Sequence, residues 1–158
     1  AKDGGNIAQS EIHKSFYTYT ITIDLDKVGI DKNDNIEVSN EEKAKRVVEL
    51  LDTIKFLYRD IKGRRENLTP VFAIGGVYDI KNPFFENKLQ VKNGKIVIDV
   101  IESVYGLDQC IKGETVVGLI RKIFANDDEI IDRLQAKEMG EFFENLKAKV
   151  NKYYAENK

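Results

Sequence analysis

Two kinds of side chain alternate in the sequence FYTYTITIDLD, from Phe16 to Asp26. From Tyr17 to Leu25 every second residue is tyrosine, isoleucine or leucine, and the residues between them are threonine and then aspartate. A period of two residues is typical of a β-strand with one face on a core and the other face free. The segment therefore predicts a half-exposed strand whose free face carries hydroxyl groups and then two carboxylates.

The composition fits a single domain that spans residues 1–158 and has enough apolar content for a core. The 25 basic and 27 acidic side chains leave a formal charge of −2, which argues against coating nucleic acid by bulk charge but allows a local basic site. The lone cysteine, Cys110, indicates a reducing cytoplasm with no disulfide framework. Since no apolar run reaches the roughly 18 residues of a membrane span, we expect a cytoplasmic protein with no membrane partner.

The start of the chain does not resemble a natural N-terminus. It opens on Ala1 with a polar, glycine-bearing stretch, and its only methionine is Met139. We expect a C-terminal portion of a longer protein; removal of an initiator before Ala1 is the alternative.

A long amphipathic helix is predicted from about Glu41 to Lys62. Ser39 with Glu42 three residues later forms the capping-box pattern. Apolar residues then recur at helical spacing, at Ala44, Val47, Val48, Leu51, Ile54, Leu57, Tyr58 and Ile61. Gly63 stands where a left-handed residue commonly ends a helix.

Two further β elements are predicted downstream. The run from Pro70 to Ile74 is apolar on both faces, as in a central strand, and Gly75-Gly76 is expected to interrupt it at a bulge or a close approach. Asn93-Gly94, between residues 89–92 and 95–101, is a strong hairpin signal.

The remaining periodic segments read as helices. Thr115 to Phe124 predicts a short helix despite Gly118, and Asn126 is expected to cap a last helix that continues to Tyr153. The order strand, helix, strand, hairpin, helix, helix predicts an α+β fold with helices packed on one face of a mostly antiparallel sheet.

The basic turn Lys62, Arg64 and Arg65 is the leading candidate site. Two guanidinium groups on a glycine-loosened turn can each hold phosphate oxygens bidentately, and Asn67 could add neutral donors. The plain alternative is that these cations compensate the dipole at a helix end.

Other candidate residues have simpler alternatives. His13 and Lys14, just before the predicted strand, could contact RNA or lie in an ordinary loop. Asp24 and Asp26 could share a divalent ion in a nuclease, or mark a strand end rising into solvent. Gly75-Gly76 matches no nucleotide-binding fingerprint, and we expect no cofactor and no metal site.

The segment from Glu11 to Gly29, the helix from Ala44 to Leu57, and the turn Gly63-Arg64-Arg65 ahead of Pro70-Val71 occur in a familiar order. This pattern, from roughly Glu11 to Gly76, resembles the DevR family of CRISPR-associated proteins, the backbone subunits of type I and particularly I-B Cascade complexes.

The resemblance implies an RRM-like (ferredoxin-like) sheet whose subunits polymerise along a CRISPR RNA. The implied partners are CRISPR RNA, further copies of the protein, other Cascade subunits, and target DNA through the guide; cleavage is left to a recruited enzyme. The family's first strand, which belongs at the centre of such a sheet, is absent from this sequence.

We therefore predict a non-catalytic RNA-binding subunit in which Arg64, Arg65 and Lys62 hold guide phosphates, with His13, Lys14 and Asn67 as further contacts. One alternative is a metal-dependent RNase that uses the aspartates of the predicted strand. The other is a protein-interaction module whose basic turn docks on an acidic surface.

Overall fold

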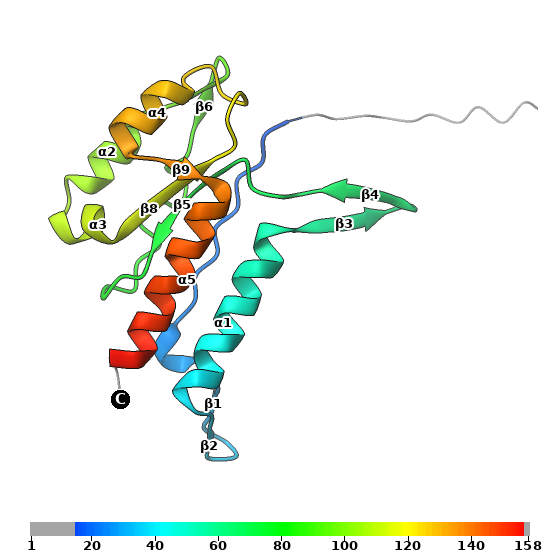
Figure 1. The fold of residues 1–158 in the computed structure, drawn as a ribbon, viewed down its shortest axis with the longest axis vertical. Coiled ribbons are helices and arrows are strands. Elements are labelled where there is room, and N and C mark those ends of the chain that lie inside the picture. The colour runs from blue at the N-terminus through cyan, green and yellow to red at the C-terminus, as the bar shows by residue number, and fades with distance from the viewer. Residues whose placement is uncertain (1–14, 157–158) are drawn as a thin grey trace, which may run out of the picture.

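The computed structural model describes residues 15–156, which combine helices and strands (Figure 1). After a 3₁₀ turn, Leu25–Lys27, the helices are α1 Asn40–Lys55, α2 Ile98–Tyr105, α3 Gln109–Glu114, α4 Asp127–Leu134 and α5 Met139–Glu156. The strands are β1 Ile30–Asp31, β2 Ile36–Glu37, β3 Tyr58–Ile61, β4 Arg64–Asn67, β5 Phe72–Gly76, β6 Val91–Lys92, β7 Lys95–Ile96, β8 Thr115–Leu119 and β9 Lys137–Glu138. The predicted α+β class is confirmed. No helix within this range is long and apolar enough to cross a bilayer.

The main sheet has three strands in the order β5-β8-β9, and the other strands form three hairpins. β5 and β8 are antiparallel over five residue pairs, from Phe72 opposite Leu119 to Gly76 opposite Thr115. β9 adds two residue pairs parallel to β8, whereas the hairpins are all antiparallel, so the mostly antiparallel prediction is confirmed. The predicted central strand is, however, an edge strand: β5 pairs only with β8 within the described chain.

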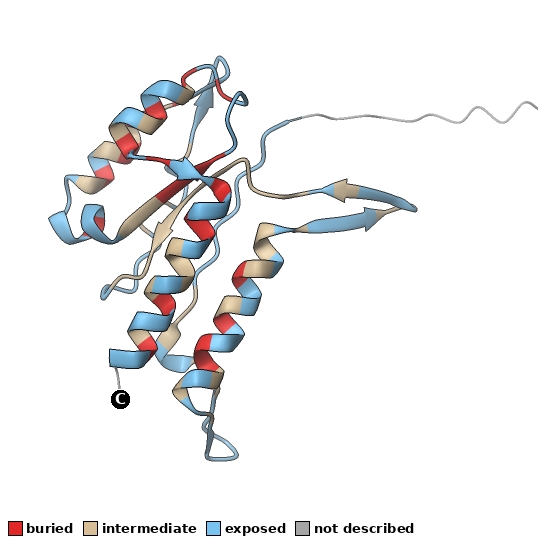
Figure 2. Cartoon of the chain, viewed as in Figure 1, coloured by how far each residue is buried: buried red, intermediate tan, exposed pale blue. Residues whose placement is uncertain are grey.

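Helices cover both faces of the main sheet. On one face α1 and α5 enclose a cluster with Val47 and Phe143 at its centre, and Val116 of β8 packs against it. On the other face Val117 of β8 joins Ile101 of α2 and others in a second cluster. Successive strand residues point to opposite faces, which is why one strand serves both clusters. Figure 2 shows buried residues along α1, α5 and β8. The sequence predicted helices on one face of the sheet, and the structure has helices on both faces. Neither face of this sheet is free.

The strand predicted from Phe16 to Asp26 does not form in this structure. Residues 15–24 have no regular secondary structure, and the 3₁₀ turn follows. A strand needs a ladder partner, and no strand of residues 15–156 pairs with this segment. Its end is held instead by side chains: the Tyr154 hydroxyl donates to the Leu25 carbonyl over 2.7 Å, and Lys81 pairs with Asp26.

The long helix begins as predicted but ends earlier. The Ser39 side chain accepts a hydrogen bond from the Glu42 N–H over 3.3 Å, as the capping pattern requires. The helix ends at Lys55 instead of Lys62, because the next residues form the hairpin β3–β4. Lys62 and Gly63 have φ values of 49° and 78°, the left-handed pair that a two-residue hairpin turn needs. The positive φ predicted for Gly63 thus occurs in a hairpin turn and not at a helix end.

The downstream β predictions are partly corrected. The turn at Asn93-Gly94 is confirmed, with φ values of 51° and 73°, but the strand after it is short because α2 begins at Ile98. Gly75-Gly76 does not interrupt β5 and lies within it. A Cβ atom on Gly76 would lie 2.3 Å from the Glu114 carbonyl oxygen, so this glycine permits a close approach.

Two helix predictions are wrong. Thr115 to Phe124 is not helical, since its first five residues form β8, as β-branched residues around Gly118 favour when a sheet can take them. The single last helix is two helices, α4 and α5, separated by the left-handed Gln135 (φ 53°) and by β9. Asn126 stands at the N-cap position of α4, as predicted, but its buried side chain bonds to the backbone of Ile96 and makes no capping hydrogen bond.

Candidate nucleic-acid interface

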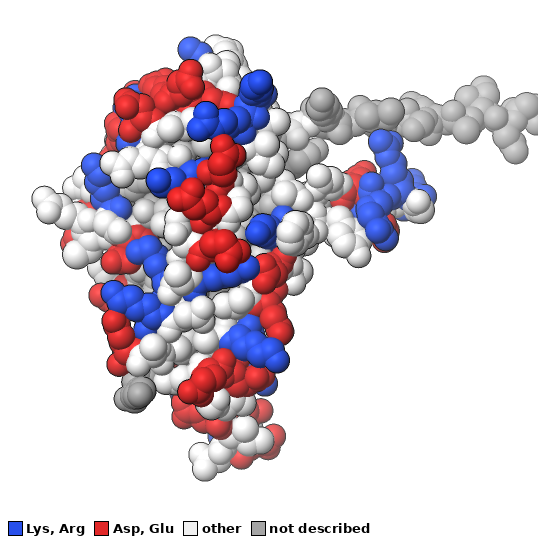
Figure 3. All heavy atoms as spheres, in the orientation of Figure 1, with Lys and Arg blue, Asp and Glu red and all other residues white. Residues whose placement is uncertain are grey.

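The β3–β4 hairpin extends from the end of α1 away from the helices and the main sheet (Figure 1) and is mostly exposed (Figure 2). Its register places Arg59 opposite Glu66, Asp60 opposite Arg65, and Ile61 opposite Arg64. Together with Lys62 at the turn, the hairpin carries four basic and two acidic residues. Figure 3 shows the resulting group of basic side chains on this projection.

The four cations differ in their partners. The Arg65 Nε lies 3.3 Å from an Asp60 carboxylate oxygen, and its guanidinium carbon lies 4.5 Å from the centre of the Tyr58 ring. Arg59 pairs with Glu66 over 3.4 Å. Within residues 15–156, Lys62 and Arg64 have no carboxylate within ion-pair distance. The uncompensated positive charge is therefore at the turn and on the first residue after it.

The structure brings four of the six predicted site residues onto this hairpin. Lys62, Arg64, Arg65 and Asn67 belong to its turn and second strand, and the Asn67 side-chain oxygen accepts from the Thr69 N–H over 2.9 Å. His13 and Lys14 lie outside the described residues. The helix-dipole alternative no longer applies, because α1 ends seven residues before Lys62.

Sequence reasoning missed the first strand of the hairpin. Arg59 was not singled out, and Tyr58, which is 53% exposed, was placed in the apolar stripe of a helix. The signal that could have found them is the Lys62-Gly63 pair between two four-residue segments with charged residues at their centres, since glycine favours the left-handed conformation of such a turn.

Asp24 and Asp26 are ion-paired with lysines. Lys27 lies 2.6 Å from Asp24, and Lys81 lies 2.6 Å from Asp26 and 3.8 Å from Asp24. The hydrogen bond from Lys27 lowers the pKa of Asp24, and the one from Lys81 lowers the pKa of Asp26. No group of three metal-ligating side chains occurs in the part of the chain that the structure describes. These carboxylates attach the first segment to the loop after β5, and the geometry gives no support to a shared divalent ion.

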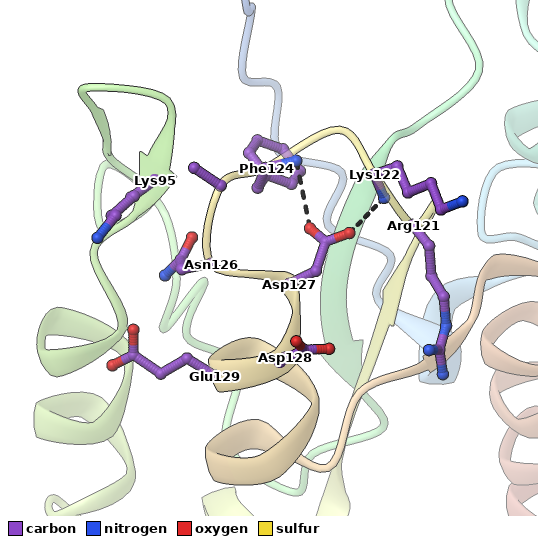
Figure 4. Close-up of a pocket in the computed structure, with 9 residues that line it drawn as sticks. Lys95, Arg121, Lys122, Phe124, Asn126, Asp127, Asp128 and Glu129 are labelled. Carbon is purple, nitrogen blue, oxygen red and sulfur yellow. Dashed lines mark hydrogen bonds between the residues drawn. The ribbon is translucent and has the colours of Figure 1, made fainter.

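A hollow of about 590 Å³ lies at the start of α4 (Figure 4). Lys95, Arg121 and Lys122 line it together with acidic residues of the first turn of the helix. Asp127 already accepts hydrogen bonds from the backbone N–H groups of Lys122 and Phe124. The Asp127 carboxylate therefore stabilises the loop before α4, and the hairpin remains the candidate interface.

The fold and this interface define an α+β protein with a projecting basic hairpin. The sequence profile of the family described as CRISPR-associated negative auto-regulator DevR/Csa2 matches residues 1–97. The match covers more than half of the chain and includes the hairpin, so this protein belongs to that CRISPR-associated family. No curated protein and no solved structure matches the chain.

Proposed function

We propose that this CRISPR-associated protein is a non-catalytic, RNA-binding backbone subunit of a type I (I-B) Cascade complex. The observation that supports this most directly is the projecting hairpin with Lys62 and Arg64 free of ion pairs among the described residues. On a chain with a net charge of −2, such a local excess of positive charge suits a protein that holds a few phosphates per copy. The partners would be CRISPR RNA, further copies of the chain and other Cascade subunits.

The two arginines would engage the guide backbone in different ways. Arg64 can offer its planar donor pair to a phosphate at once, whereas Arg65 must first give up Asp60. Lys62 adds a point charge at the tip, and Asn67, His13 and Lys14 are proposed as further contacts. Contacts of this kind position the backbone, and sequence is then read by base pairing between the guide and the target DNA.

The test is a salt titration of RNA binding by the variant with Arg64→Ala and Arg65→Ala. If both arginines contact phosphate, the slope of log affinity against log salt should become shallower by about one to two units. The loss of affinity should be similar for unrelated RNA sequences, because phosphate contacts carry no sequence information. A matched control is Arg46→Ala with Arg121→Ala, which removes two exposed arginines that pair with Glu42 and Glu138.

Three results would contradict the proposal. An unchanged slope would remove the two arginines from the interface. Cleavage of RNA with magnesium or manganese would favour a nuclease. Absence of RNA binding by properly folded protein would favour a module that docks on other proteins.

A further inference from the structure

The backbone of the loop between β8 and α4 is held at three points. The Ile120 N–H, at its start, donates to the Val71 carbonyl over 2.9 Å. The Asp127 carboxylate, at its end, accepts from the backbone N–H groups of Lys122 and Phe124 (Figure 4). A loop that is bonded in this way holds its side chains in fixed positions, as a binding surface requires.

The aromatic ring of Phe16 lies on this loop. Its centre is 5.3 Å from the centre of the Phe124 ring, and the two ring planes are inclined by 32°. Phe124 is buried and packs edge-on against Phe72 of β5, with the ring centres 6.3 Å apart. Phe16 therefore has two rings behind it, while 50% of its own surface is exposed. Because every nucleobase has a π-face, an exposed ring that is fixed in this way can stack on a base of a single strand.

Lys122 places a positive charge in the same loop, two residues before Phe124. It is exposed, and in the described part of the chain no carboxylate lies within ion-pair distance of its amino group. Its neighbour Arg121, by contrast, pairs with Glu138 over 2.8 Å. The Lys122 φ of 64° is a left-handed value that is uncommon for lysine, and Figure 4 shows the side chain directed away from α4. The amino group is thus available to a ligand.

This surface continues the candidate interface. The β3–β4 hairpin ends at Asn67, and Val71, which accepts the first hydrogen bond of the loop, is four residues further along the chain. Four residues span at most about 14 Å, so a single strand that lies on the hairpin can extend to the loop. Exposed rings beside unpaired cations are the combination with which proteins hold single-stranded nucleic acid. The family match ends at residue 97 and does not include this loop.

We propose that Phe16 and Lys122 form a second contact for single-stranded RNA, in which the ring stacks on a base and the amino group binds a phosphate. This inference rests on the proposed function, since the same RNA would lie on the hairpin. The second contact differs from the hairpin in using a base as well as a phosphate. It adds affinity without sequence preference, because stacking and phosphate contacts both tolerate any sequence.

Filter binding of single-stranded RNA by variants of Phe16 tests the stacking. Phe16→Leu keeps an apolar side chain over Phe124 but removes the ring, so the affinity should fall at least about fivefold with an unchanged salt slope. Phe16→Tyr retains the ring and should bind like the parent. On an RNA of the same length whose bases are replaced by abasic sites, Phe16→Leu and the parent should bind equally.

Lys122→Asn tests the phosphate contact. Asparagine tolerates a positive φ, so the loop should be retained, and the salt slope should become shallower by about 0.7 unit, the value of one phosphate contact on a single strand. Lys32→Asn is the matched control. It removes an exposed lysine from the β1–β2 hairpin, at the opposite end of α1 from the β3–β4 hairpin (Figure 1), and should change neither affinity nor slope.

RNA affinity that is retained in Phe16→Leu, or a salt slope that is retained in Lys122→Asn, would overturn this second contact and favour a surface that docks on protein. An equal loss by Phe16→Leu on intact and abasic RNA would overturn it as well. If the variant with Arg64→Ala and Arg65→Ala lost binding while the two loop variants bound like the parent, only the second contact would fail. If the parent bound no RNA, the proposed function would fail with it.

Discussion

Arg64 and Arg65 are adjacent and chemically identical, yet the hairpin register gives them different environments. Arg65 stands opposite Asp60 and lies over the ring of Tyr58, whereas Arg64 stands opposite Ile61, which cannot pair with it. A guanidinium that already pairs with a carboxylate must give up that pair to bind a phosphate. Its contribution to the binding free energy is therefore smaller by the free energy of the ion pair. An exposed ion pair of this kind stabilises by only about 0–1 kcal/mol.

Removing the competing carboxylate should therefore strengthen RNA binding. With Asp60→Asn, we expect the affinity to rise by up to about fivefold and the salt slope to become steeper by just under one unit, because Arg65 is freed for a phosphate. Filter binding at several salt concentrations measures both quantities. Glu42→Gln, which frees Arg46 on α1, is the control and should change neither. An affinity unaltered by Asp60→Asn would place Arg65 outside the interface.

The β3–β4 hairpin depends on its two-residue turn. Gly63 has a φ of 78°, and an alanine there would cost about 1 kcal/mol because its Cβ crowds the backbone. We expect Gly63→Ala to speed amide exchange in β3 and β4 and to weaken RNA binding. The midpoint of thermal unfolding should barely move, since these strands lie in no core cluster. Gly94→Ala changes a turn glycine of similar φ (73°) in another hairpin and should leave RNA binding unchanged. A large fall in the unfolding midpoint for Gly63→Ala would show that the hairpin belongs to the cooperative core.

Secondary-structure features could be predicted from the sequence where a few neighbouring residues determine them. The Ser39 cap and the Asn93-Gly94 turn depend on a few neighbouring residues, and both are where the sequence places them. The end of α1 was not predictable, because Tyr58 and Ile61 continue the apolar spacing of the helix while belonging to a strand. In the candidate site the basic residues could be read from the sequence, but the pairing of Arg65 with Asp60 follows from the strand register and could not.

The strand β8 joins the two halves of the core. It pairs with β5, which lies in the family-matched region, although β8 itself lies beyond residue 97. Its alternate residues contribute to both core clusters, and Gly118 lets α5 approach it closely. An apolar run with a glycine carries little local sign of such a role. The prediction from sequence was therefore wrong for this strand, because strands and helices distant in the chain determine its conformation.

Gly118→Ala tests this close contact. An added Cβ would lie 2.5 Å from Cβ and 2.8 Å from Cγ of Phe142, and because a Cβ atom moves only with its backbone, α5 must shift. We expect the free energy of unfolding to fall by about 1–3 kcal/mol, the usual cost of overpacking, in chemical denaturation. Gly113→Ala in α3 is the control: its Cβ would meet nothing within 4 Å, and alanine should stabilise the helix by about 0.5–1 kcal/mol. If the two substitutions had the same effect, α5 would not pack tightly on β8 at this glycine.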